Sequence, residues 1–202
     1  MNGVGTTARI GTTLSGRNSR ISCSRRTWIL LTLLGMDATN LVTELIKAGV
    51  PSQQLCVSNA PGVQILVTWF RLFEVTGLAF KLGITKDGIW GRETQNGVAL
   101  AKPGAPFFLP ILELPFARFK RSLEDQLAGV GVDPELVQYF PFEDTVTTAI
   151  TSHSEKWQTL GLAWIEELPM SEKMLEALGE AKRTAMTQRL RHRAQSLLAK
   201  QR

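Results

Sequence analysis

The side chains that could act in catalysis are few, and no catalytic arrangement stands out among them. Ser152, His153 and Ser154 place an imidazole between two hydroxyl groups. Neighbours in sequence do not make a catalytic triad, because the three groups must also meet in space with defined hydrogen bonds. Cys56 with His153 would be the alternative pair of nucleophile and base. We expect His153 to lie at the surface, near the start of a helix.

Carboxylate pairs and metal ligands give no stronger indication of chemistry. Adjacent acids occur at residues 124–125, 143–144 and 166–167, but adjacent residues on a helix point in different directions and do not share a site. The two His and two Cys of the chain cannot complete a zinc site of the usual nitrogen and sulfur type without carboxylates. We therefore expect a protein that is not an enzyme and carries no cofactor and no metal.

Basic residues gather at both ends of the chain. Residues 1–35 contain five Arg and residues 182–202 contain seven Lys or Arg, and neither segment contains an acid. All 18 acids lie between these segments, together with 11 basic residues. Basic ends are typical of segments that bind polyanions or anionic surfaces, or that direct a protein to a compartment.

The N-terminal segment 1–36 differs in composition from the rest of the chain. It is rich in Ser, Thr, Gly and Arg, which is typical of an organelle transit peptide or a disordered basic arm. Arg25 and Arg26, before a short apolar run, resemble a twin-arginine export signal. Met36 as the true start is a third interpretation. The composition favours a cytoplasmic or organellar protein over an exported one.

The apolar spacing predicts a mainly α-helical fold. Pro, Gly and Ser residues divide the chain into segments of helical period, and the predicted helices cover residues 37–49, 61–83, 92–102, 115–129, 133–140, 144–152, 154–168 and 171–202. We expect one compact domain over residues 37–181, a helical bundle or helical hairpin. The disordered basic arm 1–36 would precede it, and a basic amphipathic helix, 182–202, would follow it.

The longest apolar segment, residues 61–82, is predicted to be a central core helix. On a helical wheel its polar residues Gln64, Arg71, Glu74 and Lys81 fall within about 100° of one another. A helix in lipid would leave these charges without water at a cost of several kcal/mol. We therefore expect no integral membrane span.

Two later segments begin in nearly the same way. Residues 154–157 and 171–174 both read Ser-Glu-Lys followed by an apolar residue, and a Leu-Gly pair follows each at 160–161 and 178–179. A serine at this position is a preferred N-cap. The sequence therefore predicts two similarly capped helices that pack as a hairpin.

One local motif resembles a known family. Residues 82–98 contain Leu-Gly, then Asp87-Gly88 and Trp90-Gly91, and then Thr94, which is similar to the core of the peptidoglycan-binding three-helix repeat. The resemblance implies a tight turn at Asp87-Gly88 that Trp90 anchors to the core, and it implies cell-wall binding. The alternative is a purely structural turn.

The C-terminal helix is the best candidate for a binding element. We expect a non-enzymatic helical scaffold or adaptor that docks on a protein partner or larger assembly through this helix. A nonspecific nucleic-acid-associated protein and an envelope module are the alternatives. The hypothesis would fail if Arg189, Arg191 and Arg193 were neutralised by the protein's own carboxylates. The predicted contacts are the apolar Met186, Leu190 and Leu197 and the basic Arg183, Arg189, Arg191, Arg193 and Lys200.

Overall fold

The computed structural model describes residues 38–201, except residues 59, 61, 63, 76, 77, 79 and 103. All described residues fall within one compact unit, Leu34–Arg202. The basic segment 1–36, with its predictions of a transit peptide, an export signal or a disordered arm, lies outside the described residues.

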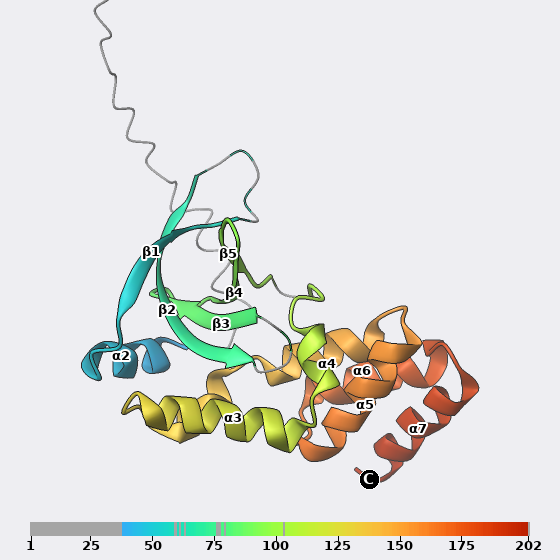
Figure 1. Ribbon diagram of the computed structural model, residues 1–202. Helices are drawn as coiled ribbons and strands as arrows, with labels where there is room; N and C mark the ends of the chain where they lie inside the picture. Colours follow the sequence, from blue (N-terminus) through green and yellow to red (C-terminus); the bar gives the residue numbers. More distant parts are fainter. Residues whose placement is uncertain are drawn as a thin grey trace, which may run out of the picture. The chain divides into compact units, whose positions relative to one another are not determined.

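The first part of this unit is an antiparallel sheet that follows one short helix. Each strand pairs with the next one along the chain, and Figure 1 shows how strongly the sheet curls. The elements are α2 (Thr39–Lys47), β1 (Ser52–Cys56), β2 (Leu66–Val75), β3 (Phe80–Thr85), β4 (Trp90–Thr94) and β5 (Gly97–Leu100).

The sheet overturns the prediction of a mainly α-helical bundle. The segment 61–83, expected to be the central core helix, contains β2 and most of β3, and the expected helix 92–102 is replaced by β4 and β5. The description "all-alpha" is therefore wrong for this chain, which has a mixed α and β fold. The motif 82–98 likewise consists of strands and their turns, not of helices.

The curl of the sheet brings its last strand back to its first. Val57 and Val98 form a parallel bridge, and Ser58 N donates to Val98 O at 2.8 Å. Gly97 has a φ of 124°, and a Cβ placed on it would lie 2.0 Å from Cys56 O. Only glycine tolerates both this backbone conformation and this approach, so the contact between β1 and β5 depends on it.

Two further glycines make room for Trp69 of β2. A Cβ on Gly83 would lie 2.6 Å from Trp69 Cζ2, and a Cβ on Gly91 would lie 3.3 Å from Trp69 Cη2. Trp69 is fully buried, and its Nε1 has no hydrogen-bond partner among the described residues. The indole thus occupies the space that side chains of β3 and β4 would otherwise fill.

Helices make up the rest of the unit. They include three short 3₁₀ segments, η1 to η3, and five α-helices. In chain order they are η1 (Leu109–Glu113), α3 (Phe116–Gly129), η2 (Pro134–Tyr139), α4 (Phe142–Thr151), α5 (Glu155–Trp164), η3 (Ile165–Glu167), α6 (Glu172–Thr184) and α7 (Gln188–Ala199).

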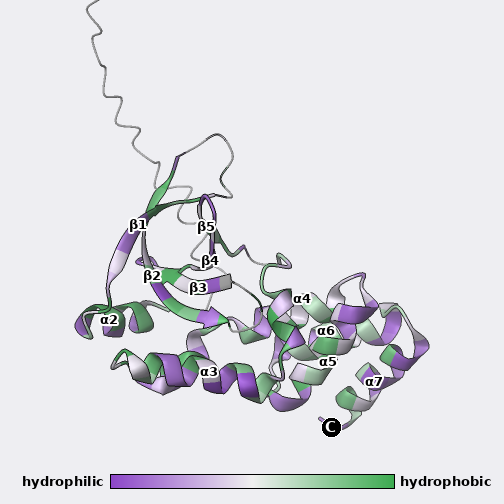
Figure 2. Ribbon diagram, viewed as in Figure 1, coloured by the Kyte–Doolittle hydropathy of each residue, from purple (hydrophilic) through white to green (hydrophobic). Residues whose placement is uncertain are grey.

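The predicted helix at residues 115–129 is confirmed as α3, and it has one apolar face, because Phe116, Phe119, Leu123 and Leu127 are all buried. Figure 2 shows hydrophobic and hydrophilic residues alternating along this helix. The other side of the helix carries charged residues and faces water, as an amphipathic helix does.

The two similar helix starts are confirmed, but the expected hairpin is not. The Ser154 side chain accepts a hydrogen bond from Trp157 N, and the Ser171 side chain accepts one from Met174 N. However, α5 packs mainly against α4, and α6 packs against α7 and α4.

One hydrophobic core joins the sheet to the helices. It extends from Phe73 and Trp90 in the strands to Leu197 in α7. Trp90 stacks on Phe73 at a centroid distance of 5.8 Å, and its Nε1 donates to Tyr139 O at 2.8 Å. The predicted anchoring of the turn at Gly88 by Trp90 is therefore confirmed, and Gly88 has the positive φ, 78°, of a tight turn.

Candidate interaction surface on the helices α6 and α7

The predicted docking helix is part of the fold. Leu190 and Leu197 are only 2% and 5% exposed, and Ala194 between them is fully buried. These side chains belong to the hydrophobic core shared by the sheet and the helices. The apolar stripe of α7 therefore packs against its own chain and is not available to a partner. Met186, in the turn before α7, is the exception at 53% exposed.

Two of the three arginines proposed for docking face carboxylates of this chain. Arg193 donates from Nε and Nη2 to Oε1 of Glu166, at 3.1 and 2.9 Å. Arg189 Nη2 lies 3.9 Å from Oε1 of Glu155, a longer and more exposed pair. These contacts join α7 to α5 and η3, so they remove much of the electrostatic basis for a docking surface on α7.

The third arginine supports the turn between α6 and α7. Arg191 Nη1 donates to Ala185 O at 2.7 Å, which satisfies a carbonyl group at the end of α6. On the other side of the turn, Met186 N donates to Oε1 of the buried Gln158 at 2.9 Å, and Gln158 Nε2 donates to Ser152 O. The turn is therefore held at two points while the Met186 side chain remains exposed.

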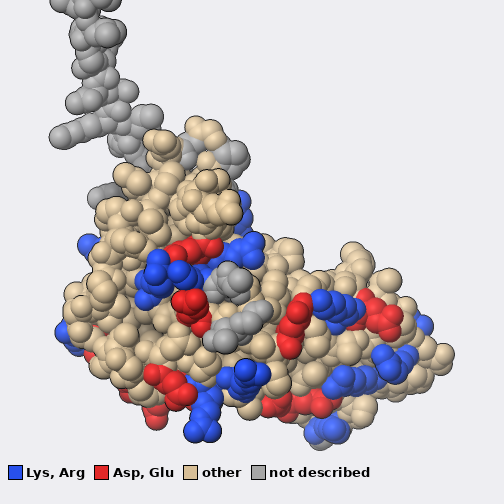
Figure 3. All heavy atoms as spheres, viewed as in Figure 1, with Lys and Arg blue, Asp and Glu red and all other residues tan. Residues whose placement is uncertain are grey.

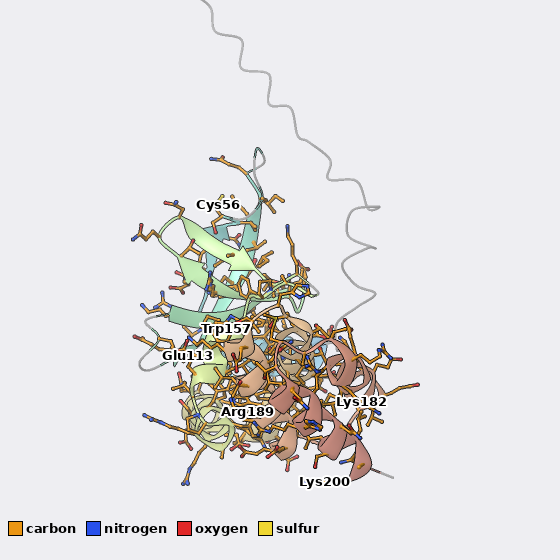
Figure 4. The ribbon with its side chains drawn as sticks, turned by 90° about the vertical axis from the view of Figure 1, so that its right-hand side faces the viewer. Cys56, Glu113, Trp157, Lys182, Arg189 and Lys200 are labelled. Atoms are coloured by element: carbon orange, nitrogen blue, oxygen red, sulfur yellow. The ribbon has the colours of Figure 1, made fainter. Side chains whose placement is uncertain are left out.

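The remaining predicted cations are exposed. Arg183 and Lys200, together with the neighbouring Lys182, form no ion pair with any described residue. Figure 4 shows Lys182, Arg189 and Lys200 well apart from one another. The basic residues of this region are thus distributed around the two helices and do not form one concentrated patch.

The outward face of α6 carries an acidic stripe that the sequence analysis overlooked. Glu172, Glu176 and Glu180 are all exposed, and no described residue forms an ion pair with them. Like charges four residues apart on a helix repel one another. Leu175, 36% exposed, lies beside this stripe. The spacing of four between the glutamates was the sequence signal for this face.

The two Leu-Gly pairs have different surroundings. At Gly161 in α5, a Cβ would lie 2.8 Å from Ala149 Cβ, so this glycine allows α4 and α5 to approach closely. At Gly179 in α6, a Cβ would meet nothing within 4 Å. The backbone conformation does not require glycine there either, because the φ of Gly179 is not positive.

The catalytic candidates are not brought together as a site. His153 is exposed between α4 and α5, as predicted, whereas Cys56 lies in β1. Both neighbouring serines serve helix ends, since Ser152 Oγ donates to Ala149 O and Ser154 caps α5. Among the acidic pairs, Asp144 is bound to Lys173 and Glu166 to Arg193.

An open groove of about 360 Å³ lies between η1 and α5. Its two carboxylates already have cationic neighbours, because Glu113 pairs with Lys156 at 2.5 Å and Glu155 pairs with Arg189. Lys156 also lies 4.6 Å from the ring centroid of Trp157. Charges of both signs therefore meet within the groove, and it shows no net preference for a charged ligand.

A bidentate ion pair joins β2 to β4. Arg71 Nε and Nη2 donate to the two carboxylate oxygens of Glu93 at 2.5 and 2.8 Å. The hydrogen bonds to Glu93 raise the pKa of Arg71 above its ordinary value. Arg71 pairs with Gly83 of the intervening strand β3, and Glu93 belongs to the strand beyond it, so the ion pair spans three strands. The pair stabilises the curl and uses up both charges.

Comparison with known proteins gave no match to a family model, to a curated protein or to a solved structure. None of the helices in the described part of the chain combines the length and the apolar character needed to cross a bilayer. No three His, Cys, Asp or Glu side chains of the described residues lie close enough together to hold a metal ion.

Proposed function

We propose that this protein is a non-enzymatic scaffold or adaptor, whose docking surface is the outward face of α6 and the turn into α7. The proposal rests on one observation, namely that the apolar and charged side chains of this face are exposed and have no partners among the described residues. Leu175 and Met186 are exposed apolar side chains, and the acidic stripe and the cations Lys182 and Arg183 around them have no ion-pair partner among the described residues.

The mixture of charges favours a protein partner over a nucleic acid. Phosphate backbones attract only cations, whereas three glutamates lie on the same helix as Lys182 and Arg183. Over the face shown in Figure 3, Lys and Arg side chains alternate with Asp and Glu side chains. A partner surface that carries both signs can satisfy such a pattern, and complementary charges set the register of docking.

The test is binding of a tagged full-length chain to proteins in a lysate of its native cells. Lys182→Gln with Arg183→Gln is expected to lose the bound partner, because it removes both free cations at the docking surface. Arg118→Gln with Arg121→Gln is the matched control, since these two exposed cations lie on α3. The control is expected to keep the partner.

Equal capture by both double variants would overturn the docking surface. Capture that nuclease treatment abolishes, with affinity for generic RNA that falls steeply with salt, would instead support the nucleic-acid alternative. Thermal unfolding of each variant serves as the check that the substitutions have not altered the fold.

A further inference from the structure

We infer that the partner of α6 is the α6 helix of a second copy of this chain, packed antiparallel with its closest approach at Gly179. This inference rests on the proposed function and names the occupant of the same surface. Three features of α6 carry it, namely an unexplained glycine, a self-complementary order of charges and an exposed apolar side chain.

The glycine of the other Leu-Gly pair, Gly161, has a packing role that Gly179 lacks in the described fold. Gly161 lies where α5 meets α4, at a distance that leaves no room for a Cβ. Gly179 occupies the corresponding place on α6 but faces open space. Glycine in the middle of a helix is unfavourable relative to alanine, and nothing in the described fold requires it here. A helix from outside, as close as α4 is to α5, would require it.

The charges along α6 are complementary to those of a second α6 helix that runs in the opposite direction. Glu176 precedes Gly179 by three residues, about 4.5 Å along the axis, and Arg183 follows it by four, about 6 Å. In an antiparallel pair centred on Gly179, Glu176 of each copy therefore lies opposite Arg183 of the other. At 100° per residue both side chains lie within about 60° of Gly179 on the outward face. Two equivalent ion pairs result, as a two-fold axis demands.

The other exposed residues fit the same arrangement. Leu175 and Lys182 flank Gly179 on one side of the face, so Leu175 of one copy would contact the aliphatic stem of Lys182 of the other. Glu172 begins α6, and Met186 lies in the turn just beyond its other end. An antiparallel pair therefore brings the start of the acidic stripe of one copy toward the turn with the exposed Met186 of the other. The repulsion within the stripe is relieved by the opposite copy's cations.

The face is available for this contact. The buried residues of α6 are Met174, Ala177, Leu178 and Ala181, and α4 and α7 are its main packing partners, so the outward side carries no described element. A helix of 13 residues is about 20 Å long, and two such helices bury less than the roughly 1,200 Å² of a standard stable interface. We therefore expect a reversible dimer that forms at micromolar concentrations.

Sedimentation analysis of the full chain over a concentration series tests the dimer. Arg183→Glu and Glu176→Arg are each expected to weaken dimerisation about tenfold, because each places like charges opposite one another. The combined variant Glu176→Arg with Arg183→Glu restores the opposite charges and is expected to recover most of the affinity. Arg118→Glu on α3 is the control and is expected to dimerise like the unmodified chain.

Gly179→Ala provides a second test that a loss of folding cannot imitate. It is expected to raise the melting temperature of the dilute monomer, because alanine favours the helix and has space there. The same change is expected to weaken the dimer, since the added methyl group separates the two backbones.

A chain that stays monomeric up to millimolar concentration, or a charge-swapped variant that does not recover, would overturn the dimer. The proposed function fails differently, through equal partner capture by the Lys182→Gln, Arg183→Gln variant and its α3 control. A monomeric chain that still loses its partner in that variant would keep the docking surface and exclude self-association.

Discussion

Gly83 shows how one residue decides whether the sheet can close. It lies between Arg71 of β2 and Gly91 of β4 in the strand register, and Trp69 occupies the space beside it. A side chain at this position would meet both the indole ring and the carbonyl oxygen of Phe70, 2.2 Å from the added Cβ. The backbone oxygen cannot move without breaking the pairing of β2 with β3.

Gly83→Ala is therefore expected to destabilise the fold by about 3 kcal/mol, the upper range for overpacking. Urea denaturation followed by circular dichroism measures the effect. Gly129→Ala, at the end of α3 where a Cβ meets nothing within 4 Å, is the control and is expected to be neutral or stabilising. Equal stability of the two variants would contradict the packing of Trp69 against Gly83.

At the scale of single residues, the sequence predicts those features that depend only on residues close by in the chain. The caps Ser154 and Ser171, the turn at Gly88 and the anchor Trp90 all follow from neighbouring residues. Strand β2 was missed because its register shifts between Arg71 and Phe73. The extra residue of a bulge separates the exposed Arg71 and Glu74 by three positions, which is a helical spacing. The bulge depends on pairing with β3, which single-sequence periodicity does not contain.

Helix α7 illustrates the same limit at the scale of an element. An apolar stripe of Leu190, Ala194 and Leu197 predicts correctly that the helix has a buried face. The stripe does not indicate whether the surface that buries it belongs to the same chain or to another one. The stripe belongs to the chain's own core, and the surface that we propose for docking lies on α6 instead. Its unpaired acids and the open side of Gly179 could be recognised only with the neighbouring helices in place.

Leu190→Ala distinguishes these two roles of α7. As a core residue, Leu190 is expected to contribute about 2–5 kcal/mol to the free energy of unfolding, whereas a side chain kept for a partner would contribute little. Arg193→Gln is the comparison. Its ion pair with Glu166 is more than a third exposed on average, so we expect a loss below about 1 kcal/mol. Chemical denaturation of both variants gives the two values.

At the scale of the whole molecule, the sheet and the helices share one hydrophobic core. The cluster includes strand residues Phe73 and Ile84 together with helix residues Ile150 and Leu178. A second, smaller cluster of Val57, Val67, Trp69 and Val98 lies within the sheet. Because the larger cluster spans both parts, neither part buries its apolar surface without the other.

We therefore expect the described unit to unfold in one cooperative transition. Tryptophan fluorescence and far-ultraviolet circular dichroism are expected to give coincident denaturation curves. Two separate transitions would show that the sheet and the helices are independent. If the inferred dimer forms, the melting temperature is also expected to rise with protein concentration, and this dependence is expected to disappear in Arg183→Glu.

The enclosed indole of Trp69 gives the sheet an optical signature. This ring is fully buried, and its Nε1 has no hydrogen-bond partner in the described part of the chain. Few dipoles can reorient around its excited state, so its emission is expected at short wavelength and beyond the reach of iodide. Trp69 is one of five tryptophans in the chain, so it supplies one component of the emission. Opening the contact between Cys56 and Gly97 would admit water and shift that component to the red, and a variant that keeps Trp69 as its one tryptophan would report on the closure of the sheet.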